Sequence, residues 1–450
     1  MPDVTGSDRQ FPRARVCVLR NARIAACLAE GLAFEPEPDA FALCDLTIDN
    51  GRIAAIDRPG AEGAPDLPAF DLDGGIALPR LVDVHTHIDK GHIWPRRPNP
   101  DGTFISALNH VAADREAHWT AHDVRTRMEF SLRCAFAHGT GALRTHIDSL
   151  GKQAAISWPV FDEVRHNWKG RIALQGVAIY PIDLAVDDEP QFAALVDIVA
   201  RYCGVLGGVT YLGRPPGEKF DLALDRIFLA AERHGLDLDF HVDESASPDA
   251  RTLGRIAEFA LRRRFPGRIV AGHCCSLALA DGAERDATIG KVAEAGIAVV
   301  SLPMCNMYLQ DRGDRTTPRW RGVAPLHELE AAGAATMVAS DNTRDPFYAY
   351  GDLDLIEVFR EATRILHFDH SQTPWLRAIA ATPAAVMGLA GHGRMAPGGS
   401  ADLILTRARS LNELLSRPQS DRVVLVAGQP IDTTLPDYRE LDALLGGSAV

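Results

Sequence analysis

Short apolar runs alternate with longer amphipathic stretches from about residue 81 to residue 390. The runs read as strands, since they are almost continuously hydrophobic and too short for helices. The stretches between them, such as residues 220–235, follow the helical period of 3.6. Strands that are buried on both faces and joined by helices are typical of parallel sheets. The pattern predicts an α/β fold, a (β/α)8 TIM barrel, with strands at residues 81–89, 141–149, 171–181, 204–212, 236–244, 268–275, 297–304 and 335–342.

Both ends of the chain have a purely β pattern instead. Residues 14–25 and 44–58 resemble strands, and Asn50-Gly51 is a strong signal for a hairpin. Residues 392–408 and 421–431 return to the same pattern. We predict that the two ends pair into one small β-sandwich domain. The expected division is residues 1–78 and 392–450 for this domain and residues 79–391 for the barrel.

Composition and charge narrow the range of partners. The net charge of −13 argues against a nucleic-acid partner, because phosphate binding needs a basic surface. No window approaches 18 consecutive apolar residues, and the N-terminus lacks the apolar core of a signal peptide. The eight cysteines are scattered without a C-x-x-C pair, which is typical of reduced, buried thiols. We expect a cytoplasmic protein with no membrane partner.

Residues that bind metals or move protons follow several of the expected strands. In this fold the active site lies at the C-terminal ends of the strands. An H-x-H pair on one strand projects both rings to the same side, because the side-chain period of a strand is two. Taken singly, each histidine is more often structural, and an aspartate at such a place could cap a helix. Several such residues follow successive strands and would lie together at the C-terminal end of the expected barrel. This shared position favours a metal centre built from His85, His87, His241, Glu244, His273 and Asp341.

This set of residues suits hydrolysis. Three or four nitrogen and oxygen ligands hold one divalent ion and leave a position open for water. An aspartate beside that water can take its proton, and a glutamate close to a ligand can pass a proton to the substrate. His146 ends the second expected strand and points to the same face, so it is a candidate pocket residue.

The motifs resemble the metal-dependent amidohydrolase superfamily, and within it the cytosine deaminase branch. The similarity covers nearly the whole chain and rests on HTHID (85–89), RTHID (144–148), HVDE (241–244), GHCC (272–275), NMYLQDR (306–312), SDN (340–342), DPFYAYG (345–351) and PGGSADLIL (397–405). The resemblance implies one zinc or iron ion bound by His85, His87, His241 and Asp341. It also implies Glu244 as the proton shuttle, His273 as a hydrogen-bond partner of the attacking hydroxide, and Asp341 as acceptor of the water's proton. Relatives of this kind are commonly homo-oligomers.

Two absences bear on the type of centre. Binuclear relatives carry a carboxylated lysine at the end of the fourth strand, and none of the five lysines of this chain lies in residues 204–212. The other zinc deaminase plan, H-x-E with P-C-x-x-C, is also missing. Both observations favour a mononuclear amidohydrolase centre.

The predicted pocket departs from that of cytosine deaminases. Ile182 stands where those enzymes have a glutamine that reads the pyrimidine edge, although a shift of one residue would place Asp183 there. Asn342 replaces a second aspartate, and Phe347 replaces a tryptophan. Such changes redirect specificity, because a site built to pair polar groups rejects substrates that leave them unpaired. We count Ile182, Asn342, Phe347 and His146 as candidate substrate contacts.

Several functions remain open from the sequence. The first is a metal-dependent hydrolytic deaminase of a small amino-substituted nitrogen heterocycle, with cytosine as the leading substrate. The second uses the same centre to remove an alkylamine from an amino-triazine, since the start HTHIDK also resembles N-isopropylammelide hydrolases, or to open a cyclic amide. A scaffold without activity is disfavoured because every expected ligand is present. His92, Trp94 and Arg96 in the following loop either touch substrate or pack the loop down.

Overall fold

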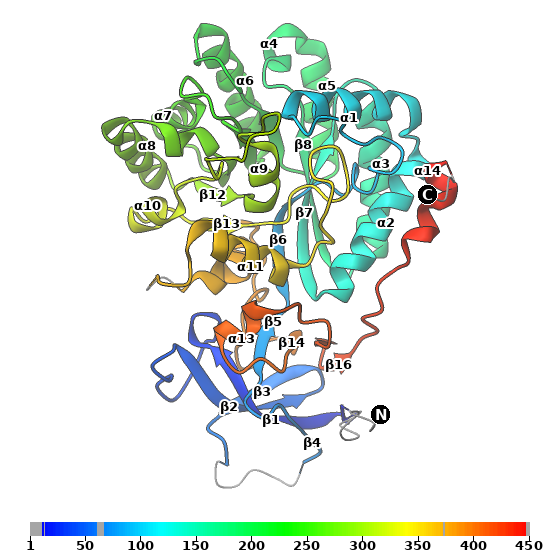
Figure 1. Ribbon diagram of the computed structural model, residues 1–450, viewed down its shortest axis with the longest axis vertical. Helices are drawn as coiled ribbons and strands as arrows, with labels where there is room; N and C mark the ends of the chain where they lie inside the picture. The colour runs from blue at the N-terminus through cyan, green and yellow to red at the C-terminus, as the bar shows by residue number, and fades with distance from the viewer. Residues whose placement is uncertain (1–10, 13, 61–66, 372–373, 447–450) are drawn as a thin grey trace.

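The computed structural model describes residues 11–12, 14–60, 67–371 and 374–446. Figure 1 shows a helix-rich unit built on parallel strands above a smaller β unit that contains strands from both ends of the chain. The β-rich ends and the α/β middle predicted from the sequence are therefore both present.

All eight strands predicted for the middle of the chain form, and they pair in parallel in chain order. A three-stranded sheet contains β6 (Leu81–Thr86), β7 (Thr140–Asp148) and β8 (Ala173–Ile179). A five-stranded sheet contains β9 (Leu206–Val209), β10 (Leu238–Val242), β11 (Ile269–His273), β12 (Ala298–Ser301) and β13 (Thr336–Val338). Single parallel bridges, Val177 to Val205 and Thr86 to Asp341, join the edges of the two sheets. Among the described residues the ladder is thus two sheets rather than one continuous barrel.

Helices follow most of these strands and cover the sheets on the outside (Figure 1). Local signals explain their limits. Thr120 caps α2 by accepting a hydrogen bond from the Asp123 amide, and α6 ends at Gly235 in the left-handed conformation. The helices of this unit are α1 (Phe104–His118), α2 (Ala121–Ala137), α3 (Gln153–Asn167), α4 (Leu184–Asp187), α5 (Glu189–Arg201), α6 (Glu218–His234), α7 (Thr252–Arg263), α8 (Gly282–Glu294), α9 (Pro303–Leu309), α10 (Leu326–Ala331), α11 (Leu355–Leu366) and α12 (Ala381–Val386).

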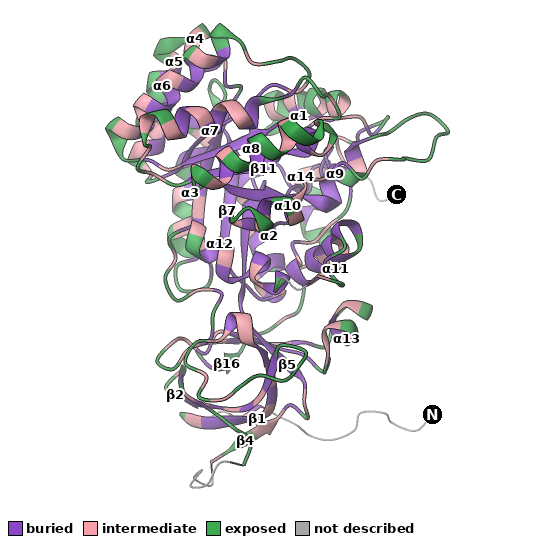
Figure 2. Ribbon diagram, turned by 90° about the vertical axis from the view of Figure 1, so that its left-hand side faces the viewer, coloured by how far each residue is buried: buried purple, intermediate pink, exposed green. Residues whose placement is uncertain are grey.

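The buried side chains lie on the inner faces of the helices and along the strands that the helices cover. Helix α6 directs Phe220, Leu224, Ile227 and Ala231 to the interior, at the spacing of one helical face. The strands of the parallel sheets are buried almost along their whole length (Figure 2). Side chains pack against both faces of these strands. A polar residue on them is therefore expected to have a structural or functional role.

Strands from both chain ends form one eight-stranded mixed sheet, with β4 attached to β1 at its side. The strands are β1 (Val16–Ala25), β2 (Phe41–Asp49), β3 (Arg52–Asp57), β4 (Ala69–Asp71), β5 (Ile76–Pro79), β14 (Leu403–Leu405), β15 (Val423–Val426) and β16 (Gln429–Pro430). The pairing of β14 with β5 joins the two ends, as predicted. The second layer expected for a sandwich is not a separate sheet in the described parts of the chain.

The predicted hairpin is confirmed between β2 and β3. Asn50 and Gly51 both have positive φ, 49° and 75°, which suits a two-residue turn with the right-handed twist of the strands. A Cβ atom at Gly51 would lie 2.5 Å from the carbonyl oxygen of Ala427. Glycine is therefore required both by the turn and by the close approach of the C-terminal part of the sheet.

The end of the described chain leaves the mixed sheet and returns to the α/β unit. After α13 (Leu411–Ser416) and β16, the last helix, α14 (Asp442–Leu445), lies beside α2 (Figure 1). Leu441 packs against Phe130 and Cys134, and Tyr438 stacks on Phe130 with ring centroids 5.6 Å apart. The Arg344 guanidinium lies 3.9 Å above the Tyr438 ring. This segment thus ties α2 to the loop that follows β13.

A helix that crosses a bilayer must be both long and apolar. Within the described residues, no helix combines the two to the degree that crossing a bilayer requires. This agrees with the absence of a long apolar window in the sequence.

Candidate active site

The predicted metal ligands converge at the C-terminal ends of the parallel strands. His85 belongs to β6 and His241 to β10, whereas His87 directly follows β6 and Asp341 comes three residues after β13. The Nε2 atoms of His87 and His241 lie 3.2 Å apart. The Asp341 Oδ1 atom lies 3.3 Å from His87 Nε2 and 3.6 Å from His85 Nε2. Four residues from three distant segments of the sequence therefore meet around one point.

This cluster fits a divalent cation. His85 and Asp341 are buried, and neither ring nitrogen of His85 nor either carboxylate oxygen of Asp341 has a hydrogen-bond partner among the described residues. Burial lowers the pKa values of His85, His87 and His241 well below the usual range, so the imidazoles are neutral. Neutral imidazoles beside a carboxylate are the donors that zinc and iron accept. Buried polar atoms without partners are unfavourable unless a ligand binds them.

Glu244 and His273 lie next to the cluster. Glu244 Oε1 is 3.3 Å from His273 Nδ1, and the Asn306 amide donates to it at 3.2 Å. Burial and the nearby Asp341 raise the pKa of Glu244 well above its usual range. A carboxyl group that keeps its proton in a buried site is suited to proton donation.

The backbone is strained at two of these positions. His273 has φ of 68° and Asp341 has φ of 64°, in the left-handed region that side chains rarely adopt. Both residues stand at the end of a strand, where the chain turns away from the sheet. Such strain is typical of sites where function sets the direction of a side chain. The turn aims both side chains at the cluster.

A cavity of about 330 Å³ opens onto the cluster. Its volume lies at the lower end of the range for small-molecule sites. The walls include Phe104, Val111, Ile182 and Phe347, while His87, His241, Glu244, His273 and Asp341 stand at its polar end. The cavity therefore offers apolar faces for a flat ring and a group of polar side chains at one edge.

Three of the four predicted substrate contacts line this cavity. They are Ile182, Asn342 and Phe347. Asp183 lines it as well, and its carboxylate accepts hydrogen bonds from Tyr211 at 2.6 Å and from Arg214 at 2.7 Å. The choice between Ile182 and Asp183 is thus not exclusive, since Ile182 forms an apolar wall and Asp183 joins a polar network.

His146 lies elsewhere. It is fully buried, its ring centroid is 4.0 Å from that of His85, and its Nε2 atom is 3.8 Å from Asp239 Oδ1. It is not among the described residues that line the cavity. Its ring packs against those of His85, His87 and His241, with centroids 4.0, 5.3 and 4.5 Å away, so it lies against the cluster and not in the cavity wall.

Lys90 was missed by the sequence analysis. It is buried, lines the cavity, and its ammonium lies 3.6 Å from Asp148 and 5.5 Å from the centre of the Phe347 ring. Asp148, Asp89 and Asp345 raise its pKa against the effect of burial, so it remains charged. The only sequence signal is its place directly after HTHID.

Asn306 and Cys305 on α9 were missed too. The Asn306 amide holds Glu244 and lies 2.9 Å from His273 Nδ1, so it orients both side chains. Cys305 is buried next to Asp341 and Asn342, within a group of possible ligand atoms that includes Glu244. The motif NMYLQDR contains Asn306, but its role depends on where α9 packs.

Within the loop after β6, three candidate side chains, His92, Trp94 and Arg96, do not line the cavity. Arg96 pairs with Asp114 and Asp123 at 2.8 and 2.6 Å. His92 is buried with its ring centroid 4.8 Å from that of Phe130. Neither these residues nor Trp94 is among the described residues that line the cavity. Of the two interpretations of this loop, packing holds for His92 and Arg96.

Comparisons with known proteins show the family to which the chain belongs. A model of the amidohydrolase family matches residues 178–432, more than half of the chain. The chain belongs to the amidohydrolase family and is a hydrolase of C–N bonds other than peptide bonds. It is 53% identical to a pterin deaminase of Rhizobium rhizogenes strain K84 over 435 residues, which cover 97% of this chain and 98% of the relative.

Solved structures show the same fold. A 5-methylcytosine deaminase from Klebsiella pneumoniae matches with a TM-score of 0.76 and 23% identity, over 94% of this chain and 98% of that one. An N-isopropylammelide isopropylaminohydrolase from Burkholderia multivorans matches with a TM-score of 0.72 and 24% identity, over 93% and 98%. At this level of identity the match concerns the fold alone.

Proposed function

We propose that this protein hydrolyses the exocyclic amino group of a pterin-type ring and releases ammonia. The observation that carries the proposal is the 53% identity to a pterin deaminase along almost the entire chain. The buried cluster of three histidines and one aspartate beside the cavity supports it. Water adds its oxygen to the amidine carbon of the ring, the bond from this carbon to the amino nitrogen breaks, and the products are an oxo ring and ammonia.

One divalent ion, zinc or iron, is part of this proposal. His85, His87, His241 and Asp341 would hold it, as their convergence and their unpartnered buried atoms suggest. When bound, such an ion acts as a Lewis acid and lowers the pKa of water to near neutrality. The same proposal includes residues 79–391 as a closed (β/α)8 unit around the site.

The side chains next to the cluster provide the proton transfers. Protonated Glu244 would donate from its carboxyl oxygen to the ring nitrogen beside the attacked carbon, and then carry a proton to the leaving amine. Asp341 would take a proton from the attacking water. His273 would direct its free Nε2 atom, which has no partner in the described part of the chain, towards the reacting oxygen. Asn306 holds the side chains of Glu244 and His273 in position relative to each other through its two contacts.

The cavity walls favour a pterin over cytosine. Ile182 cannot form the hydrogen bond that a glutamine would give to a pyrimidine edge. Phe347 and Phe104 meet edge to face with centroids 5.3 Å apart, and together with Val111 they form an extended apolar lining. A bicyclic ring covers more of this surface than a single ring, and each additional buried CH₂-sized group contributes about 0.8 kcal/mol.

A substrate panel tests the proposal. We expect metal-loaded protein to release ammonia from pterin at least about a hundredfold faster, in kcat/KM, than from cytosine, which corresponds to two or three unmatched contacts. Amino-triazines and cyclic amides belong in the same panel. An alkylamine or a new carboxylate as the product would support the alternative hydrolase activity. Ammonia from cytosine but none from pterin would contradict the proposal.

Lys90 is expected to contribute to substrate binding. Its charged ammonium lines the cavity and is free to donate to a carbonyl oxygen of the ring while Asp148 holds it from behind. We expect Lys90→Met to raise KM for pterin about 10- to 100-fold, since a hydrogen bond from a charged group contributes roughly 1.5–3 kcal/mol. Steady-state kinetics measure this change, with the exposed Lys152→Met as the control. An unchanged KM would show that Lys90 only neutralises the charges of the neighbouring Asp148, Asp89 and Asp345.

A further inference from the structure

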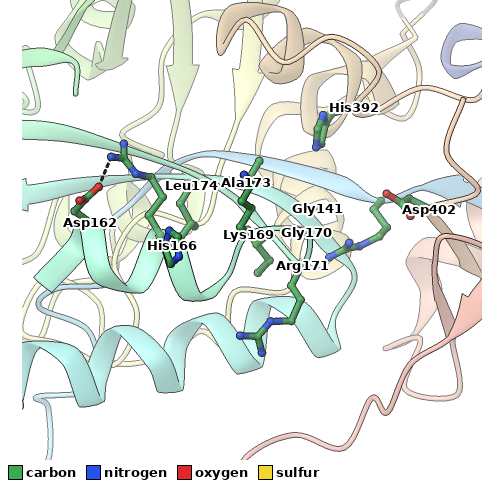
Figure 3. Close-up of a pocket in the computed structure, with 13 residues that line it drawn as sticks. Gly141, Asp162, His166, Lys169, Gly170, Arg171, Ala173, Leu174, His392 and Asp402 are labelled. Carbon is green, nitrogen blue, oxygen red and sulfur yellow. Dashed lines mark hydrogen bonds and ion pairs between the residues drawn. The ribbon is translucent and has the colours of Figure 1, made fainter. Parts of the chain in front are cut away.

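A second cavity lies at the opposite end of the parallel strands from the active site (Figure 3). Its volume is about 600 Å³, and it is lined by the start of β7, the end of α3, the start of β8 and residues next to the mixed sheet. Gly141 of β7 lines this cavity, whereas Asp148, the last residue of the same strand, lines the catalytic one. Seven residues of strand separate them by about 23 Å. The two cavities are therefore separate.

Basic side chains dominate the lining. Arg80, Arg165, Lys169 and Arg171 face two carboxylates, Asp162 and Asp402, and the lining also contains His166 and His392. Asp162 is paired with Arg165, as the dashed line in Figure 3 marks. Among the described residues, no carboxylate oxygen lies within 4.0 Å of the charged groups of Arg80, Lys169 or Arg171. A chain with a net charge of −13 thus contains a cavity with surplus positive charge.

The buried side chain of Arg80 lines this cavity. This residue joins β5 to β6 and is only 4% exposed. Its guanidinium donates to the Thr140 carbonyl and lies 5.0 Å from the centre of the Phe136 ring, but its Nε atom has no hydrogen-bond partner in the described chain. A buried charge without a counter-ion is unfavourable. An anion in the cavity would remove that cost.

Asp402 compensates the charge of Arg80 only in part. Its carboxylate acts on Arg80 from more than 4.0 Å away, and its Oδ1 atom accepts from the Ala427 amide at 2.6 Å. The basic residues at the end of α3 complement the helix dipole, which is a sufficient reason for their presence there. Arg80 is not part of that helix, so the dipole does not explain it. A Cβ atom on Gly141 would lie 3.1 Å from Arg80 Cβ, so the glycine keeps the cavity open beside this side chain.

We propose that this cavity binds a phosphate group, with Arg80 at its floor and Lys169 at its mouth. A guanidinium presents parallel N–H groups that match phosphate oxygens. The source is either inorganic phosphate or the phosphate of a nucleotide-sized molecule, for which the volume is sufficient. The ligand would contact α3 as well as the junction between the parallel and the mixed sheets, and would stabilise their contact.

Titration calorimetry of the metal-loaded protein tests the site. The probes are inorganic phosphate and adenosine 5′-monophosphate at constant ionic strength, compared between wild type, Arg80→Met, Lys169→Glu and the control Arg407→Met. Arg407 is 87% exposed and is not among the described residues lining the cavity. We expect Arg80→Met to weaken binding about 10- to 100-fold, Lys169→Glu to weaken it less, and Arg407→Met to leave it unchanged. Tighter binding of the nucleotide than of phosphate would identify the larger source.

Three results would overturn the proposal. The first is no measurable binding of either probe to wild type. The second is equal affinity in wild type and Arg80→Met. The third is competition of phosphate with substrate, as a higher KM that persists in Arg80→Met, since this would place the anion in the catalytic cavity. If Arg80→Met does not fold, Lys169→Glu tests the site by itself, because Lys169 is exposed and lines the cavity. Unchanged affinity in this variant would then contradict the proposal.

Discussion

Glu244→Gln is expected to reduce kcat for ammonia release by about 10²- to 10⁴-fold, the usual contribution of a general acid or base. The amide is almost isosteric and keeps the contact with Asn306, but it has no acidic proton to pass to the ring nitrogen. Because Glu244 is not one of the four proposed ligands, the metal content should stay at the wild-type level. Pre-steady-state and steady-state assays with pterin, together with metal analysis, measure both quantities.

The matched control for this variant is Glu163→Gln. Glu163 is half exposed on α3, where it pairs with Arg125, and it is not among the described residues that line the catalytic cavity. We expect its kcat and metal content to equal those of the wild type. If Glu244→Gln instead lost the metal, Glu244 would be a ligand rather than a proton shuttle, and wild-type kcat would exclude both roles.

Removal of the metal is the second prediction with a large expected effect. Dialysis against a chelator should abolish ammonia release and lower Tm, because three buried imidazoles and Asp341 then lose their common partner. A ligand at about a hundred times its Kd stabilises the folded state by about 2.7 kcal/mol. Addition of zinc or iron should restore both activity and Tm, and the ion that restores kcat identifies the active metal.

A pair of histidine variants makes this test specific. His87→Ala removes one proposed ligand, so it should bind less metal and remain inactive after metal is added back. His234→Ala changes an exposed histidine at the end of α6 and should behave like the wild type. Full activity of the chelated protein, or of metal-loaded His87→Ala, would be incompatible with the proposed centre.

The strands and the metal-binding cluster could be predicted because their cause is local. A parallel strand that is buried on both faces must be apolar along its length, so the eight strands were visible as runs in the sequence. A polar residue at the end of such a run is conspicuous, and this led to His85, His241, His273 and Asp341. The hairpin at Asn50-Gly51 followed from the backbone conformations of two residues.

Other features depended on packing between distant segments. Lys90 lies beside the cavity only because the loop after β6 turns back over β7, where Asp148 holds its ammonium. His146 has the same sequence context as His87 and lies level with it in the β6–β7 register, yet it packs against the His85 ring and is not among the described residues that line the cavity. The path of the last helix to α2 could not be predicted either, because a short amphipathic segment carries no information about which surface it will cover.

By itself the sequence determined the secondary structure, the pairing of the two chain ends and the set of chemical groups at the strand ends. These properties follow from side-chain period, turn conformation and burial within single elements. Only the tertiary structure decided which of these groups face the catalytic cavity, where Lys90 and Asn306 act, and that Arg80 is buried beside a second cavity with its Nε atom unpartnered among the described residues. These properties depend on how the strands are aligned and on contacts between loops that are far apart in the sequence. They therefore cannot be predicted from a local sequence pattern.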